Sequence, residues 1–379
     1  MLDPRQLENA LDLLESRYRE VEHQYIEKIG KMVRRIGMMN AASIDMLSVM
    51  MGMHEDVTEI LTELTRATRL NEAEVARLLE QTEHSTFTDD RFRRALNHQP
   101  LNPYQKAVIR QYTQAVAAQT AQLMDNLSNT TAVSAPYQRA VDAAVLAVST
   151  GLTDYNSAIR NTIRDIGFNG LQVQYESGYH RRLDTAVRQN ILDATKQVAQ
   201  KTAEMVGESL GYNAVEISAH LHSAPDHAPV QGRVFLRTEY DKMQSGQSFT
   251  GVDGTQYAGF KRPLMEWNCM HIVMPFDTRY SVRAYSDEQL AKWEADNQKG
   301  CEIGGKHMTT YQASQLMRKL ETDVRRWKET AYMAKVAGDT ALQTQAQMKI
   351  TDLTNAYSRV CNASGLSSRR ERMRVELPR

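Results

Sequence analysis

Side chains that bind transition metals are concentrated in one stretch of the chain, residues 214–285. This stretch holds four of the ten histidines and one of the three cysteines, namely His220, His222, His227, Cys269 and His271. The pairs His220-x-His222 and Cys269-x-His271 are each short enough to present two side chains from one strand or turn, and zinc accepts mixed nitrogen and sulfur donors. The spacings match no established zinc pattern, so these side chains could equally hydrogen-bond within a small, loop-rich unit. We expect no resident cofactor and keep zinc as the alternative.

The same stretch also permits a catalytic interpretation. Two histidines with Asp226 and Asn268 could hold a cation and activate water, as in a metal-dependent nuclease, although no paired acidic signature accompanies them. The chain has no phosphate-binding glycine-rich loop between a strand and a helix and no G-x-S-x-G motif. Cys269 has only His271 nearby to activate it, and a buried structural thiol is more common. We expect a protein that is not an enzyme, with a metal-dependent nuclease or a transferase as the alternative.

Basic residues near the C-terminus form the candidate contact with DNA. Arg369, Arg370, Arg372 and Arg374 are offset only by Glu371, and arginine neutralises phosphates without reading sequence. A second basic stretch, 318–328, contains balancing acids and is typical of a solvated helix face. Basic and acidic residues each number 46 in the whole chain, so no overall positive field predicts nucleic-acid binding.

Short strands are expected to position the histidines and Cys269. Residues 215–220 alternate apolar and polar side chains, which is the pattern of a half-buried strand. The apolar runs 234–236 and 272–274 are bounded by turn-forming residues and also predict strands. Between them, residues 245–254 are rich in glycine and polar residues, which predicts a loop or a loose hairpin tip.

Long amphipathic helices are predicted on both sides of this stretch. Apolar residues recur at spacings of three and four from Leu7 to Ile36 after an Asp3-Pro4 start, and further helical patterns cover 38–66, 104–125, 136–165, about 180–210 and 309–363. Asn71 is expected to cap a further short helix, and the last run is expected to break near Gly338 and Asp339. The predicted fold is mainly α with a small α+β domain. We divide the chain into helical regions 1–100 and 101–170, an α+β domain 171–290, and a helical hairpin with a basic tail at 291–379.

Methionine is abundant at the start of the second helical pattern. Six of the nineteen methionines are Met38, Met39, Met46, Met50, Met51 and Met53. Methionine on a helix usually fills a core, but its flexibility also suits a surface that docks on a partner in more than one geometry. The core interpretation is our expectation, and the docking surface is the alternative.

The composition bears on the compartment in which the protein folds. Three scattered cysteines fit a reducing compartment and argue against a disulfide scaffold. The N-terminus, Met1-Leu-Asp-Pro-Arg5, lacks a signal-peptide core. No apolar run approaches the roughly 18 residues that a membrane span needs, so we expect no membrane span.

An ordered series of short motifs gives the chain its resemblance to a known family. The motifs are Leu183-Asp-Thr-Ala-Val-Arg188, Glu216-Ile-Ser-Ala-His220, Pro225-x-His227-Ala-Pro229, Gln231-Gly-Arg233, Trp267-Asn-Cys-x-His271, Pro275-Phe276 and Ala284-Tyr-Ser-x-Glu-x-Leu290. Over residues 170–376 the chain resembles the minor capsid protein 2 family of tailed bacteriophages, relatives of the Mu F-like minor head proteins. Ala224, Val230 and Met270 depart from that pattern, where the family tends to have Arg, Trp and Arg. The matching residues form a signature core of His220, His227, Gln231, Gly232, Trp267, Asn268, Cys269 and His271.

The resemblance implies a structural protein of the virion. Such a protein is made in the host cytoplasm and enters the procapsid with the portal, so its place is the portal vertex or the capsid interior. The implied partners are the portal protein and the major capsid or scaffold protein, with several copies in each virion. Contact with the packaged DNA and a role in head assembly or DNA ejection are further implications. A scaffold or adaptor that never remains in the particle is another alternative.

Overall fold

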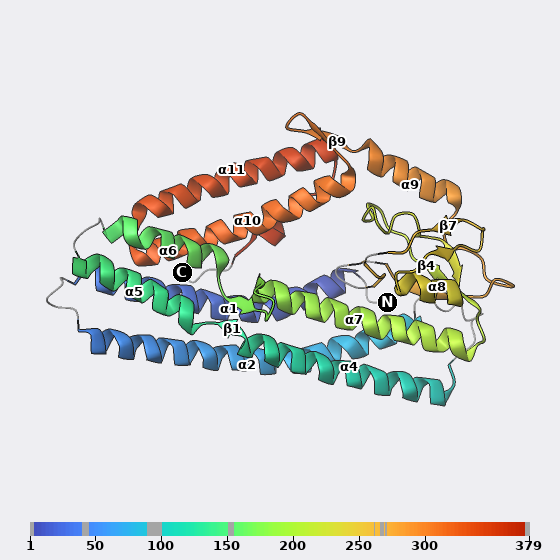
Figure 1. Ribbon diagram of the computed structural model, residues 1–379, viewed down its shortest axis with the longest axis horizontal. Helices are drawn as coiled ribbons and strands as arrows, with labels where there is room; N and C mark the ends of the chain where they lie inside the picture. Colours follow the sequence, from blue (N-terminus) through green and yellow to red (C-terminus); the bar gives the residue numbers. More distant parts are fainter. Residues whose placement is uncertain are drawn as a thin grey trace.

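A computed structural model describes residues 4–39, 45–88, 101–150, 155–260, 262–265, 269 and 271–375. The fold is mainly helical, with a small α+β unit at one end of an elongated molecule (Figure 1), as the sequence predicts. No helix among these residues is long and apolar enough to cross a membrane. The expected cap at Asp3 lies outside the described residues.

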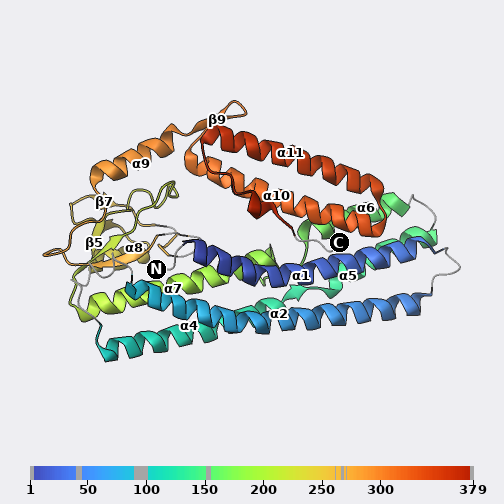
Figure 2. The ribbon, with the colours of Figure 1, turned by 180° about the vertical axis from the view of Figure 1, so that it is seen from behind.

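Seven helices form an elongated bundle, in which some lie side by side and others follow one another along the long axis (Figures 1 and 2). They are α1 (Pro4–Gly37), α2 (Met46–Thr88), α4 (Pro103–Asn129), α5 (Ser134–Thr150), α6 (Tyr155–Asn169), α7 (Leu183–Ser209) and α10 (Thr310–Ala337). The predicted apolar stripe of the first helix is fully buried at Leu11, Leu14, Tyr25 and Ile29. One hydrophobic core draws residues from α1 through to Leu342 of α11 (Thr340–Ser364). Burial of amphipathic faces against one another therefore holds the bundle together.

The second helix differs from the sequence prediction. Asn71 was expected to cap a separate helix, but α2 runs without a break from Met46 to Thr88. The Asn71 side chain instead donates to the Leu14 carbonyl at 3.0 Å and accepts from Arg17 at 2.7 Å. These bonds to α1 satisfy the amide, so it does not compete with the backbone of its own helix. The predicted helix 136–165 is likewise found as two helices, α5 and α6.

A helical hairpin closes the chain. Helix α10 begins at a Thr309 capping box, and Gly338 ends it in the left-handed region at φ 81°. Asp339 then caps α11 (Thr340–Ser364) by accepting from Leu342 N. The predicted break near Gly338 and Asp339 is thus confirmed, because a left-handed glycine ends a helix without a steric penalty. The hairpin, the strands β9 (Cys301–Ile303) and β10 (Lys306–Met308) and the short helix η2 (Arg370–Met373) are packed around a core of their own.

The small α+β unit lies at the C-terminal end of α7 (Figure 1). Its sheet has the order β5-β4-β8 with antiparallel neighbours. Its elements are β4 (Ala214–Ile217), β5 (Val234–Leu236), α8 (Arg237–Gln244), β6 (Phe249–Thr250), β7 (Gln256–Tyr257), β8 (Val273–Phe276) and α9 (Asp287–Lys299). A further small sheet, β1 (Thr131–Ala132), β2 (Gln172–Gln174) and β3 (His180–Arg182), lies against the bundle. Strands are present in all three predicted stretches, 215–220, 234–236 and 272–274, although β4 ends at Ile217 and β8 begins at Val273.

Candidate functional site

The β5-β4-β8 sheet brings the two metal-donor stretches of the sequence together. His227 lies in the connection from β4 to β5, and Cys269 and His271 lie just before β8. The pairing of β4 with β8 continues beyond Ile217, because Ser218 N donates to the Ile272 carbonyl at 2.7 Å and Ile272 N donates to Ser218 Oγ at 2.8 Å. The end of β4 therefore fixes the position of the residues that precede β8.

Gln231 and Gly232 shape the turn that returns the chain to β5. The Gln231 side chain accepts from His220 N at 3.2 Å, and Gly232 N donates to the Ile217 carbonyl at 2.8 Å. Gly232 has a φ of 68°, and a Cβ added there would lie 2.7 Å from a methyl carbon of Leu290. Only glycine fits without strain at such a position. The geometry of this turn thus accounts for Gln231 and Gly232 in the signature core.

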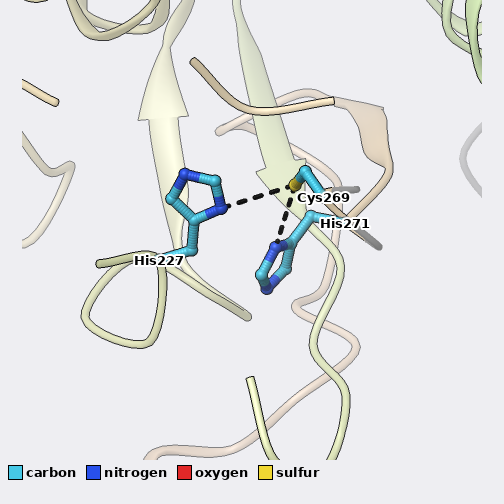
Figure 3. A group of neighbouring side chains, drawn as sticks. All are labelled: His227, Cys269 and His271. Atoms are coloured by element: carbon cyan, nitrogen blue, oxygen red, sulfur yellow. Dashed lines mark hydrogen bonds between the residues drawn. The ribbon is translucent and has the colours of Figure 1, made fainter. Parts of the chain in front are cut away.

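His227, Cys269 and His271 form one buried cluster (Figure 3). The Cys269 Sγ atom lies 3.4 Å from His227 Nδ1 and 3.4 Å from His271 Nδ1. All three side chains are at least 98% buried. The His227 Nε2 atom lies 3.0 Å from the Arg262 carbonyl oxygen, which can only accept. His227 must therefore carry a proton on Nε2, and a neutral His227 has its lone pair on Nδ1, facing the sulfur.

Hydrogen bonds alone leave one nitrogen of this cluster unsatisfied. If the thiol donates to His227 Nδ1, the second sulfur contact requires His271 Nδ1–H to donate to Sγ. His271 Nε2 is then a bare acceptor, and it has no hydrogen-bond partner among the described residues. A buried polar atom without a partner costs about 1–3 kcal/mol. The hydrogen-bonded interpretation of the cluster is therefore incomplete within the part of the chain that the structure describes.

The protonation of the three groups is set by burial and by their mutual contacts. Burial, followed by the neighbouring His220 and His227, lowers the pKa of His271 to about 3, so this ring is neutral at physiological pH. Burial also opposes charge on the other two, but their mutual hydrogen bond together with backbone hydrogen bonds outweighs it. The pKa of His227 lies above its ordinary value and that of the Cys269 thiol lies below. A lowered thiol pKa favours the thiolate, which both metal binding and nucleophilic attack require.

The other two histidines of the stretch lie beside the cluster but do not complete it. The His220 ring packs against the His271 ring with centroids 4.6 Å apart, while its Nδ1 atom lies 3.1 Å from the Leu221 carbonyl. His222 occupies the left-handed region at φ 59°. The three donor residues that the structure places within 4.8 Å of one another are His227, Cys269 and His271.

The catalytic alternative finds little support in the position of Asp226. Its carboxylate makes two contacts with the Arg262 guanidinium, at 2.9 and 3.0 Å, on the surface of the unit. Asp226 Oδ2 lies 3.8 Å from His227 Nε2, on the side of the ring opposite to the sulfur contact. The carboxylate is thus engaged by Arg262, away from the metal donors. Asn268 and the signature residue Trp267 lie outside the described residues.

One residue near the cluster was not identified from the sequence. Lys196 of α7 has a buried ammonium without a hydrogen-bond partner among the described residues. Burial lowers its pKa, whereas Asp193 and the charge of Cys269 act to raise it. No local pattern could have signalled this proximity, because Lys196 forms part of an ordinary helical stripe far from Cys269 in the sequence.

The arginines of the C-terminal tail are folded onto the helical hairpin. Arg369 Nε lies 3.5 Å from the buried Glu321, and Arg370 donates to Ser358 Oγ at 3.2 Å. Arg370 and Arg374 are exposed, whereas Arg369 and Arg372 are half-buried. Burial, and then the charges of Arg369 and Arg372, lower the pKa of Arg318 on α10. The structure therefore brings the two basic stretches, 318–328 and 369–374, together on one side of the hairpin.

Comparison with known proteins gives one family and one relative. The profile of the family described as phage minor capsid protein 2 matches residues 2–359. A structural protein of Lactococcus phage LL-H is 25% identical over 278 residues, which is 67% of this chain and 70% of that protein. No solved structure matches the chain.

Proposed function

The chain belongs to the phage minor capsid protein 2 family, and on that premise we propose that it docks on the portal protein from inside the phage head. It is then a structural component that is synthesised in the host cytoplasm and retained in the virion in several copies. The proposal gives it no catalytic role. The observation that carries it is an exposed apolar face on the bundle.

This methionine face consists of Met46, Leu47, Met50 and Met51. Their exposed fractions are 43%, 68%, 50% and 56%. Residues three and four apart share one side of a helix, so the four side chains form a continuous strip on the first turns of α2. Met38, at the end of α1, is 73% exposed. The core interpretation of these methionines does not hold for the face.

A contiguous apolar surface of this kind supports docking. Exposed apolar patches on otherwise polar proteins mark interaction sites, and methionine adapts its shape to a partner more readily than other apolar residues. The start of α2 lies at the end of the bundle opposite to the small unit (Figure 1). A partner bound to the methionine face therefore leaves the small unit accessible.

Co-purification with the portal protein of the same phage tests the proposal. We expect the portal protein to retain the wild-type chain, and the variant Met46→Gln/Leu47→Gln/Met50→Gln/Met51→Gln to lose at least about tenfold in affinity. Glutamine preserves side-chain length and helix propensity, so the variant should fold. The matched control, Leu61→Gln/Leu70→Gln, changes two exposed leucines of the same helix and should bind normally. Equal binding of both variants would contradict this docking surface.

DNA contact through the basic side of the hairpin is a second candidate function. The grouping of Arg318 with the tail arginines supports it, since clustered guanidinium groups bind phosphates and release counterions. Arg369 is a poor choice for a test, because its removal takes a cation away from the buried Glu321 carboxylate. Arg370 and Arg374 are exposed and can be changed without that cost.

Salt-dependent DNA binding tests this candidate. The variant Arg370→Ala/Arg374→Ala should reduce the slope of log affinity against log salt by about 2, one unit for each lost phosphate contact. The control Arg66→Ala/Arg77→Ala removes two exposed arginines of α2 and should leave the slope unchanged. An unchanged slope in the tail variant would refute DNA contact at these positions. Mass spectrometry of purified virions separates a resident component from an assembly factor that leaves the particle.

A further inference from the structure

We propose that His227, Cys269 and His271 bind one zinc ion, which joins the β4–β5 connection to the residues before β8. The site is a property of the small unit and does not depend on the docking or DNA-binding proposals. Two observations carry it: the spacing of the buried donor atoms and the direction of the His227 lone pair.

The spacing of the donors is close to that of a tetrahedral zinc site. Zinc bonds of about 2.3 Å to sulfur and about 2.0–2.1 Å to nitrogen place these donors about 3.5 Å apart at tetrahedral angles. Both observed sulfur–nitrogen distances are 3.4 Å. One nitrogen of each ring and the sulfur lie within 4.8 Å of one another, and zinc requires about 3.3 Å between two nitrogen donors.

The lone pair of His227 is directed correctly for a metal. Its Nε2 proton is donated to the Arg262 carbonyl, 3.0 Å away. That bond fixes the tautomer in which Nδ1, facing Cys269, is unprotonated. A backbone carbonyl that holds the distal ring proton is the usual support of a zinc-bound histidine. The Asp226 carboxylate, 3.8 Å from the same Nε2 atom, adds negative charge on that side of the ring.

His271 supplies the third donor, through Nδ1. Its side chain is 99% buried, and its Nε2 atom has no hydrogen-bond partner in the described ranges. A bound metal removes the need for a hydrogen bond from His271 to the sulfur, because Cys269 is then a thiolate that binds the metal. The ring can then carry its proton on Nε2 and present the Nδ1 lone pair, on the side of the sulfur, to the ion.

The donor set selects zinc among the divalent cations. One thiolate with two imidazoles is a soft, nitrogen-rich combination that suits zinc, whereas magnesium and calcium require oxygen ligands. The Asp226 carboxylate is bound by Arg262 and does not contribute an oxygen ligand. Three protein donors leave one tetrahedral position for water.

Metal analysis of the full-length protein tests the proposal. Protein purified under reducing conditions, without chelator, should contain one zinc per chain, which EDTA removes and added Zn²⁺ restores. Replacement of zinc by Co²⁺ should produce a thiolate-to-cobalt charge-transfer band in the near ultraviolet. The cobalt spectrum reports sulfur ligation in the wild-type chain, so it does not depend on whether a variant folds. Absence of both zinc uptake and the cobalt band would overturn the proposal.

Variants identify the ligands. Cys269→Ser, His227→Ala and His271→Ala should each reduce zinc content at least about tenfold, with helical circular dichroism retained because the bundle has a separate core. The matched controls are Cys361→Ser, at a cysteine of the C-terminal hairpin, and His220→Ala, at the ring beside His271. Both controls should keep one zinc. Retention of zinc in Cys269→Ser, or its loss in His220→Ala, would overturn the assignment of these three donors.

Discussion

Replacement of Arg182 by methionine is expected to destabilise the helical bundle strongly. Arg182 is 6% exposed, and it lies between α1, α7 and α10. Its guanidinium donates to Glu22 at 2.6 Å and to Glu329 at 2.8 Å, and it lies 3.6 Å from Asp184. All three carboxylates are also buried. Methionine preserves much of the volume but removes the cation that these three groups share.

The magnitude follows from the burial of the cluster. Removing one partner of a buried ion pair costs about 3–5 kcal/mol, because the other charge is left uncompensated. Arg182 serves more than one carboxylate, so we expect a loss at the upper end of this range at pH 8. An exposed ion pair provides the control. Arg77 is 64% exposed beside Glu74, and Arg77→Met should lower the free energy of unfolding by less than about 0.5 kcal/mol.

The pH dependence gives a sharper test than the loss alone. Burial raises the pKa of Glu22 to about 8; Arg182 opposes this effect, and Glu329 and Asp184 reinforce it. A carboxyl group whose pKa is higher in the folded than in the unfolded protein stabilises the folded state when it is protonated. This contribution is complete below the unfolded pKa of 4.5 and is lost as pH rises through about 8. The slope within that window approaches about 1.4 kcal/mol per pH unit for one proton.

Loss of Arg182 should make this dependence steeper. Without the guanidinium, the carboxylates can avoid a buried charge only by taking up protons, which is easier at pH 5 than at pH 8. Urea unfolding at both pH values, followed by circular dichroism, should therefore show a smaller loss for Arg182→Met at pH 5. The triple variant with Glu22→Gln and Glu329→Gln should recover part of the stability at pH 8. A loss below about 1 kcal/mol, or an equal loss at both pH values, would refute this reasoning.

Substitutions at three further positions test two close contacts and one helix cap, with unfolding free energies as the measurement. Gly170→Ala should cost at least about 2 kcal/mol, because φ is 60° and the new Cβ would lie 1.5 Å from a Glu22 oxygen; a neutral result would show that Glu22 moves freely. Gly207→Ala places a Cβ 2.8 Å from Pro275, and overpacking of about 1–3 kcal/mol should exceed the gain in helix propensity of about 1 kcal/mol. A net gain there would show that β8 can shift. Asp339→Ala should cost about 0.5–2 kcal/mol through the lost helix cap, while Asp339→Asn should retain most of that stability.

Local patterns were sufficient to predict most of the helices and the three main strands. The stripe from Leu7 to Ile36, the break at Gly338 and the strand at Val215 each depend on neighbours in the sequence, which periodicity and capping report directly. Asn71 shows where such signals fail. Its type favours a cap, but hydrogen bonds to Leu14 and Arg17 of α1 keep it within α2. The division of the chain into four regions stays a prediction.

The candidate site was predictable as a group of residues but not as a geometry. The sequence identified five donors, and the structure brings three of them within one cluster. That choice depends on the pairing of β4 with β8 and on the turn around Gly232, which place His227 beside Cys269. The bonds of Arg182 to Glu22 and Glu329 span 160 and 147 residues, and no local pattern reports such a partner.

Helix α7 runs from the buried ion cluster around Arg182 to the proposed zinc site around Cys269. Arg182 directly precedes its first turn, and Lys196, whose charge interacts with that of Cys269, lies fourteen residues along it, on the order of 20 Å away. Sites separated by more than about 10 Å without shared partners usually contribute additively. Arg182→Met should therefore leave zinc content unchanged, and Cys269→Ser should leave the pH dependence of bundle stability unchanged. Loss of zinc in a folded Arg182→Met protein would show instead that α7 transmits strain from the buried ion cluster to the small unit.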